Sequence, residues 1–420
     1  MIAVVGVLVL VALAWAVSSN RRHALRVRSL AWGLGLQLVI AVVALRTPVG
    51  VRLFTWANDA ANAFVSFADA GIGFVFGRWP NVVAVMAPDA AAPGGFGTVV
   101  VGFVLAVRVL PLIIFIASLM AVLYHLGLMQ RVVALLARGL SRSMGISGAE
   151  ALSTVGDIFL GMTEAPLLIR PYVARMTESE LFAVMSAGMA TIAGTVLLAY
   201  VSMGIDAGYL VTASFMSAPA AVMFAKIIVP ESGTPETMGT VKVAVPRVDV
   251  NVIDAAARGA TEGLRLAANV AAMLIAFVSL VAMFDAAAGW VGGWFGHADL
   301  TLGRVLGVLL SPLAYLLGVP WSDASFVGSL LGTKTVLNEF LAYQALGAHA
   351  ATLAPRTVRI ASFALCGFAN LGSLAIVLGG LGSMVPERRK DLARLGLRSI
   401  LAGSLATFSA GAIAGLIGPG

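Results

Sequence analysis

The chain has 420 residues, of which 60% are hydrophobic and only 11% are charged. Because ordinary soluble domains carry about 25% charged residues, this composition excludes a soluble globular protein and predicts an all-α, polytopic membrane protein. The net charge of +7 comes from Lys and Arg placed between apolar segments, where they orient a membrane protein and do not indicate nucleic-acid binding. The single cysteine, Cys366, excludes an internal disulfide, and the four histidines show no metal-ligand spacing.

Eight segments are long and apolar enough to cross a hydrocarbon layer of about 30 Å. In chain order they lie at 2–18, 29–46, 97–125, 179–204, 208–229, 262–295, 356–384 and 396–417. No basic stretch precedes the apolar run of residues 1–18, so a first transmembrane helix is favoured over a secretory signal.

Two further segments, 146–176 and 320–348, are too polar at their centres to cross as plain helices. Each predicts a re-entrant hairpin, since non-helical backbone at membrane depth is tolerated where it lines a cavity. Amphipathic surface helices are predicted at 51–80, 131–142 and 300–318.

The basic loops predict an orientation. Counting the crossings places the loops at 21–28, 131–142, 226–258 and 386–398 on one side of the membrane. Those loops hold most of the Lys and Arg, so we expect that side to be cytoplasmic and both termini to lie outside.

Two glutamates, Glu164 and Glu339, lie in segments that otherwise suit lipid. A charge at membrane depth costs several kcal/mol unless a partner, water or an ion compensates it. Each glutamate precedes a second polar break, by 30 residues to Gly194 and by 31 residues to Asn370. The two halves follow the same order with opposite orientation, and such an inverted repeat with broken helices is typical of secondary transporters.

Other interpretations of these residues remain open at this point. Lys334 could pair with Glu339 in a structural ion pair, and Glu262 and Arg265 have the spacing of a helix-surface pair. Asn370, Ser373 and Thr191 could simply bond neighbouring helices. Glu164 and Glu339 could also be the acid and base of a membrane-embedded enzyme acting on a lipid-linked sugar, and a passive channel is a third possibility.

At these polar patches the chain resembles the concentrative nucleoside transporters. The resemblance extends from about residue 90 to the C-terminus. It rests on Gly161–Pro166 with the following Leu-Leu-Ile-Arg-Pro, Thr191–Val196, Asn338-Glu339-Phe340, Ala364–Asn370 and Pro386-Glu387-Arg388-Arg389, and also includes Asn251–Ala256 and Val319–Ser322.

The resemblance implies a homotrimer in the bacterial inner membrane that moves nucleosides by an elevator mechanism. The implied function is secondary active symport of a nucleoside with sodium or a proton, with no other cofactor and no enzymatic activity. The implied division is a scaffold part at 1–128, a first transport part at 129–229, a cytoplasmic loop at 230–261, a long scaffold span at 262–295 and a second transport part at 296–420.

The resemblance also implies roles for single residues. Met162, Thr163 and Glu164 should face the nucleobase, and Val196 and Phe368 should line its pocket. Glu339, Asn370 and Ser373 should hold the ribose hydroxyls. The cation site should comprise Asp157, Thr191 and the carbonyls of Leu160 and Ile192.

Two of these positions depart from the usual family pattern. Met162 stands where the family usually has Gln, which leaves the base selectivity open and admits an atypical nucleoside or a related ribosylated compound as substrate. Asp157 stands where the family usually has Asn. A carboxylate there could bind sodium or could itself carry a coupling proton.

Overall fold

The computed structural model describes residues 2–25, 27–77, 82–86, 96–100, 104–239, 249–297 and 299–418, and these are helical except for loops and one two-stranded hairpin. Residues 240–248 of the predicted cytoplasmic loop and 101–103 of the predicted third span lie outside the described residues.

The elements up to the central loop include helices of very different lengths and one pair of strands. They are α1 (Ile2–Ala16), α2 (Arg21–Ala24), α3 (Val27–Arg46), α4 (Pro48–Phe76), β1 (Val82–Met86), β2 (Phe96–Val100), α5 (Leu105–Arg108), α6 (Leu110–His125), α7 (Leu128–Met144), α8 (Gly148–Phe159), the 3₁₀ helix η1 (Ala165–Ile169), α9 (Arg170–Val173), α10 (Glu178–Ala190), α11 (Gly194–Ser202) and α12 (Ala207–Ile228).

The elements after that loop begin with the longest helix described. They are α13 (Val252–Gly293), α14 (Leu302–Leu316), α15 (Trp321–Val336), α16 (Glu339–His349), η2 (Ala350–Thr352), α17 (Pro355–Leu365), α18 (Leu371–Met384), η3 (Pro386–Arg388) and α19 (Arg389–Ile417).

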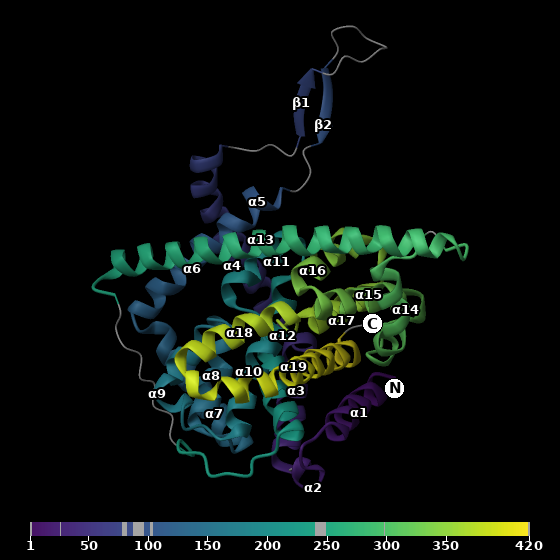
Figure 1. The fold of residues 1–420 in the computed structure, drawn as a ribbon. Coiled ribbons are helices and arrows are strands. Elements are labelled where there is room, and N and C mark those ends of the chain that lie inside the picture. The colour runs from purple at the N-terminus through teal and green to yellow at the C-terminus, as the bar shows by residue number, and fades with distance from the viewer. Residues whose placement is uncertain are drawn as a thin grey trace.

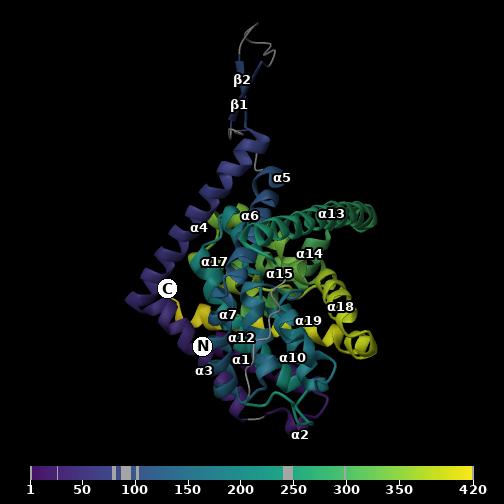
Figure 2. The same cartoon turned by 90° about the vertical axis from the view of Figure 1, so that its left-hand side faces the viewer.

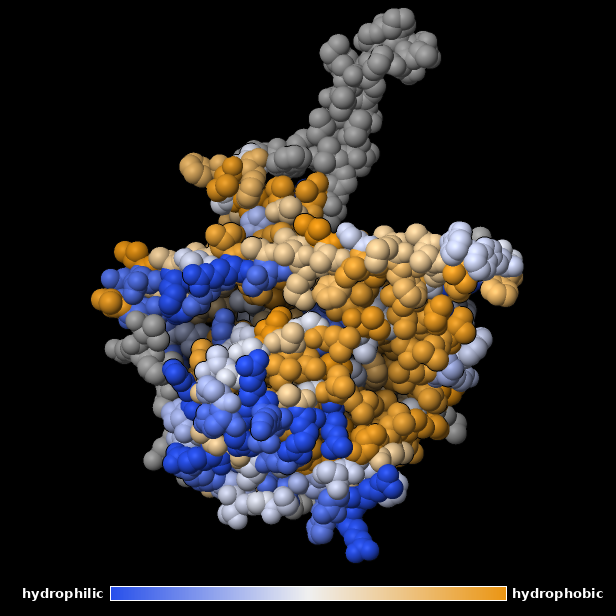
Figure 3. Space-filling view, in the orientation of Figure 1, coloured by the Kyte–Doolittle hydropathy of each residue, from blue (hydrophilic) through white to orange (hydrophobic). Residues whose placement is uncertain are grey.

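Helices α10, α12 and α19 form the centre of the molecule, and α17 packs against α19 beside them (Figure 1). In its most apolar window α12 is 89% buried, whereas α13 is only 11% buried and packs along α6. The turned view shows α4 along one edge and α13 reaching out on the other side (Figure 2). Hydrophobic residues cover the part of the surface over α14 and α15, and hydrophilic residues gather toward the end that holds α7 and α9 (Figure 3).

Six of the described helices are long and apolar enough to cross a membrane, or seven if α14 and α15, bent by 115° at their junction, are counted as one span. The prediction of eight spans differs at two places. Helix α1 has 15 residues, and the segment predicted at 356–384 is broken into α17 and α18. The count of eight therefore stays a prediction.

The predicted third span was placed too early in the chain. Its first residues belong to strand β2, which pairs antiparallel with β1 in the register Val82 to Val100, and the apolar helix covers Leu105–His125. The segment Phe-Gly-Thr-Val-Val is rich in β-branched and aromatic residues, which favour a strand.

A buried ion cluster joins the ends of three central helices. Lys226 near the end of α12 forms ion pairs with Glu150 of α8 and, at 3.2 Å, with Glu231, and it donates to Ser179 Oγ of α10 at 3.0 Å. Glu150 also accepts from the backbone N–H of Ser147 at 2.9 Å, which closes the capping box of α8. One cation thus forms ion pairs with two buried carboxylates that belong to different parts of the bundle.

Replacing Lys226 with Met should destabilise the protein strongly, because Glu150 and Glu231 would remain buried without their cation. Breaking a buried pair in this way costs about 3–5 kcal/mol. The melting temperature in detergent measures the effect. The matched control is Arg175→Met, which breaks an exposed pair with Glu236 at 3.0 Å and should cost about 0–1 kcal/mol. Equal melting temperatures for the two variants would contradict the structural role of Lys226.

Candidate functional site

One cavity of about 350 Å³ brings together residues from breaks in four helical segments. All of the residues predicted to touch a nucleoside line it, namely Met162, Thr163, Glu164, Val196, Glu339, Phe368, Asn370 and Ser373. Its volume falls in the range of about 300–1,000 Å³ that small-molecule pockets occupy. The opposite wall is one face of α13.

The first break follows α8, where the chain turns at Gly161. This glycine has φ 93°, a conformation that L residues with a Cβ rarely adopt. A Cβ there would lie 2.8 Å from Cβ of Ala193, so the turn packs directly on the start of α11. The side chains of Met162 and Glu164 follow on this turn and face the cavity.

The second break lies between α15 and α16. The Asn338 side chain accepts from the backbone N–H of Leu341 at 3.0 Å and so begins α16. Glu339 is therefore the first residue of a helix, where the helix dipole favours a negative charge. Its side chain is buried, with Oε1 accepting from Tyr200 Oη at 2.9 Å and Oε2 accepting from Asn370 Nδ2 at 3.0 Å.

The third and fourth breaks separate α10 from α11 and α17 from α18. Asn370 caps α18, because its Oδ1 accepts from the N–H of Ser373 at 2.7 Å. Ala193 precedes α11 and supplies no side-chain cap. The two breaks touch each other, since the N–H of Phe368 donates to the carbonyl of Thr191 at 3.3 Å.

The prediction that Lys334 could pair with Glu339 was wrong. Lys334 is fully buried on α15, and its ammonium donates to the carbonyl of Ala364 and to Thr407 Oγ1, each at 2.8 Å. Sequence spacing could not find these partners, which lie 30 and 73 residues away in the chain.

Asp157 is buried at 1% exposure, and neither of its carboxylate oxygens has a hydrogen-bond partner among the described residues. Its oxygen Oδ1 would lie 3.8 Å from a Cβ at Gly188 of α10, so the carboxylate faces that helix. Buried carboxylates without partners are rare, and a cation or a proton is what would satisfy such a group. The donor set needed for a hard cation is oxygen, and the carboxylate of Asp157 offers two oxygens without protein partners among the described residues.

The predicted cation residues are only partly brought to the cavity. Leu160 lines it, whereas Asp157, Thr191 and Ile192 are buried and are not among its lining residues. Thr191 Oγ1 donates to the carbonyl of Ala187 at 2.9 Å, so its oxygen still has acceptor capacity. No group of three or more His, Cys, Asp and Glu that could hold a metal ion is found in the part of the chain that the structure describes.

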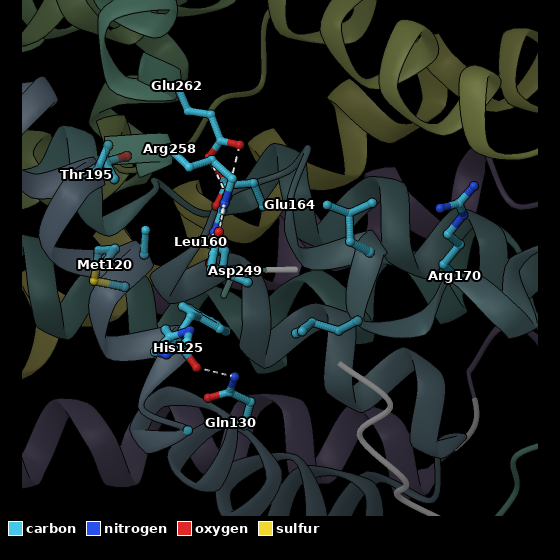
Figure 4. A pocket seen from close by; sticks show the side chains of 16 residues that line it. Met120, His125, Gln130, Leu160, Glu164, Arg170, Thr195, Asp249, Arg258 and Glu262 are labelled. Carbon is cyan, nitrogen blue, oxygen red and sulfur yellow. Dashed lines mark hydrogen bonds and ion pairs between the residues drawn. The ribbon is translucent and has the colours of Figure 1, made fainter. Parts of the chain in front are cut away.

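A second cavity of about 490 Å³ adjoins the first and shares Leu160, Glu164 and Thr195 with it. Arg258 of α13 lies in this cavity (Figure 4) and forms two bonds to Asp249, at 2.6 and 2.9 Å. The hydrogen bond from this guanidinium lowers the pKa of the Asp249 carboxyl below its usual value. Arg258 also contacts Glu262 at 2.9 Å, so the expected pairing of Glu262 with Arg265 was wrong.

The sequence prediction missed the wall supplied by α13. Glu262, Arg265, Asn269 and Met273 line the first cavity at helical spacing. The sequence does hold an indication that this helix lines a site, because Arg265 and Asn269 interrupt an otherwise apolar span. Thr195 and Asn338 also line the cavity and were not named as substrate residues.

Apolar helices that break around a cavity with a few carboxylate and amide side chains are typical of one class of membrane protein, the secondary transporters. Three family models match this chain: the N-terminal part of Na⁺-dependent nucleoside transporters at residues 5–79, "nucleoside recognition" at 106–207, and the C-terminal part of Na⁺-dependent nucleoside transporters at 209–415. The chain therefore belongs to the Na⁺-dependent nucleoside transporter family. Cation-coupled nucleoside uptake, and not catalysis, is the function of that family.

Individual relatives are similar over almost the whole chain. The nucleoside permease NupC of Helicobacter pylori is 42% identical over 98% of this chain and 96% of its own length. Sodium/nucleoside cotransporter 2 of Rattus norvegicus is 39% identical over 95% of this chain and 60% of its own length. The structure of CNTnw in an inward-facing, substrate-bound state superposes with a TM-score of 0.89 at 45% identity, covering 99% of this chain and 98% of that one.

Proposed function

We propose that this chain is a symporter that couples the inward movement of sodium, or alternatively a proton, to nucleoside uptake across the bacterial inner membrane. The observation that carries the proposal is that all predicted nucleoside-contacting residues line one cavity. One sodium ion entering down ~100 mV releases about 2.3 kcal/mol, and a tenfold sodium gradient adds ~1.4 kcal/mol. Together these support accumulation by a few hundredfold.

We assign the ribose to the end of the cavity formed by Glu339, Asn370 and Ser373. Each carboxylate oxygen of Glu339 already accepts one protein hydrogen bond and keeps further lone pairs for hydroxyl donors. Asn370 accepts through Oδ1 at the cap of α18 and donates from Nδ2 to Glu339, so these two side chains form one hydrogen-bonded unit.

We assign the base to the first hairpin turn, where Met162, Thr163 and Glu164 face Val196 and Phe368 across the cavity. Phe368 offers an aromatic face for stacking. Met162 is an apolar, adaptable side chain that cannot read a base by hydrogen bonds as an amide would. This favours recognition of the base by shape and by Glu164, and it keeps an atypical nucleoside or another ribosylated compound as an alternative substrate.

We assign the coupling cation to Asp157 with Thr191 and the carbonyls of Leu160 and Ile192. The unpartnered oxygens of Asp157 support this assignment, because a bound cation would satisfy both of them. The site lies behind the first hairpin turn, so an occupied cation site would steady the turn that carries Met162 and Glu164.

We further propose an elevator movement in a homotrimer, with α6 and α13 as part of a static scaffold. Helix α13 packs on α6 and is otherwise largely exposed, with Trp290, Trp294 and Phe295 exposed near its end. Such apolar exposure suits lipid or a neighbouring subunit. The cytoplasmic loops and outward termini follow from the placement of Lys and Arg.

The uptake of labelled uridine and adenosine into vesicles tests the proposed function. We expect saturable uptake that a sodium gradient or a proton gradient accelerates. Flux that is independent of both gradients, or the absence of uptake for every nucleoside of a broad panel, would contradict symport.

Glu339→Gln should weaken nucleoside binding by about 10–100-fold, because hydrogen bonds to a charged group contribute about 1.5–3 kcal/mol. One orientation of the new amide would also place its NH₂ against the NH₂ of Asn370. Isothermal titration with uridine measures the affinity. Glu387→Gln, a change at an exposed glutamate, serves as the control. Unchanged affinity in Glu339→Gln would remove Glu339 from the ribose site.

Asp157→Asn separates the two coupling ions. If Asp157 is a sodium ligand, the variant should still respond to sodium but require about tenfold more of it, since one charged ligand is lost. If Asp157 carries the proton, uptake by the wild type should follow the pH gradient without sodium, and the variant should lose that dependence. The control is Asp69→Asn on the exposed face of α4. A variant identical to the wild type in both respects would contradict any role of Asp157 in coupling.

A further inference from the structure

A third cavity, of about 400 Å³, lies at the C-terminal end of α7, away from the nucleoside cavity. Three arginines from two helices line it, and its described lining residues include no Asp or Glu. They are Arg28, Arg138, Ser141, Arg142, Gly145, Ile146, Met238 and Gly239.

Backbone contacts fix the walls of this cavity. Arg28 at the start of α3 donates from Nε to the carbonyl of Ser143 at 3.1 Å and from Nη2 to the carbonyl of Arg142 at 2.5 Å. These bonds cap the end of α7, where the dipole favours a cation. A Cβ at Gly145, which has φ 68°, would lie 3.0 Å from the Arg28 guanidinium.

The opposite wall is also anchored. Thr237 accepts through its carbonyl from the N–H of Gly148 at 2.9 Å and through Oγ1 from the N–H of Ala149 at 3.0 Å. Met238 forms a β-bridge with Ser147, the N-cap of α8. The cavity is therefore held between the end of α7, the start of α3 and the start of α8.

The charge of the cavity is not neutralised by the protein. Neither Arg138 nor Arg142 has a carboxylate partner within the described residues, whereas Arg175, Arg258 and Arg388 each form an ion pair. Arginine forks suit phosphate oxygens. An anion with phosphate chemistry is the ligand that this arrangement fits.

The position of the cavity favours a lipid over a soluble phosphate. Arg28 begins the apolar segment Arg28–Arg46, one of the candidate membrane spans, so it lies at headgroup depth if that segment crosses. Trp32, four residues further, is 47% exposed, and Val39 on the same helix face is 60% exposed. On α7, Val132 and Leu135 are exposed beside the basic residues. A headgroup in the cavity would thus have apolar surface next to it for acyl chains.

We propose that this cavity is a binding site for the phosphate headgroup of an anionic phospholipid, held by Arg28, Arg138 and Arg142. Basic pockets at the ends of transmembrane helices recognise such headgroups. Because the cavity borders the start of α8, a bound lipid would stabilise the corner from which the first hairpin leaves the surface.

Lipid titration of the purified full-length protein tests the site. We expect phosphatidylglycerol to raise the melting temperature in detergent saturably, and phosphatidylcholine and inorganic phosphate at equal concentration to leave it unchanged. Arg138→Gln/Arg142→Gln should raise the apparent Kd for phosphatidylglycerol about tenfold or more, since each basic residue contributes substantially to anionic-lipid binding. Arg138→Lys/Arg142→Lys keeps the charge and should stay within about threefold of the wild type.

The matched control is Arg22→Gln/Arg131→Gln, which removes the same charge from basic residues outside the cavity and should also stay within about threefold. Nucleoside binding by each variant reports that it is folded. If the double Gln variant does not fold, Arg138→Gln alone should weaken lipid binding about threefold or more. Equal losses in the cavity and control variants, or saturation by inorganic phosphate with the same arginine dependence, would overturn the proposal.

Discussion

A polar group in the interior of this bundle costs free energy unless it finds a partner, and this constraint shapes the arrangement of the helix breaks. Unsatisfied backbone and charged groups at membrane depth cost several kcal/mol each. The four helix breaks are therefore packed together, where the carbonyl of Thr191 accepts from the N–H of Phe368 and Asn370 donates to Glu339. If the breaks lay far apart, the polar groups at each break would have no hydrogen-bond partners from the other breaks.

The two halves of the chain meet this constraint differently. In the second half, Asn338 and Asn370 cap the helices that follow the breaks and so satisfy backbone N–H groups. In the first half, the residue before α11 is Ala193, which cannot cap. The first hairpin turn likewise leaves the Glu164 carboxylate open to both cavities. Both oxygens of Asp157, also in the first half, lack a hydrogen-bond partner among the described residues, which fits the cation binding that we propose there.

Some residues of the site can be predicted from the sequence because they stand out as polar within an apolar segment. Others are identified only by the tertiary contacts of the folded chain. Glu164 and Glu339 interrupt apolar segments locally, so the cost of a buried charge was enough to single them out, and the family resemblance added Asn370 and the other neighbours. The wall supplied by α13 could not be predicted in the same way. A 42-residue helix has several faces, and only tertiary packing on α6 decides that the face with Arg265 and Asn269 meets the hairpins.

The partners of Lys334 were missed for the same reason, since Ala364 and Thr407 reach it only in the folded bundle. The strand at 96–100 was missed because its apolar residues also suit the start of a span.

Glu339 and Asp157 show why two buried carboxylates in one bundle need not have the same role. Glu339 has a protein donor on each oxygen and a helix dipole at its backbone, so its charge is stabilised before any ligand arrives. Such a group is held in place by its donors and keeps further lone pairs that can accept from hydroxyl groups. Asp157 has no donor on either oxygen among the described residues, so its charge depends on what binds there. An empty site penalises the charged form, and a cation or a proton removes the penalty. A carboxylate whose free energy depends on a bound cation or proton is suited to coupling, and this is the physical reason why we propose Asp157 for that role.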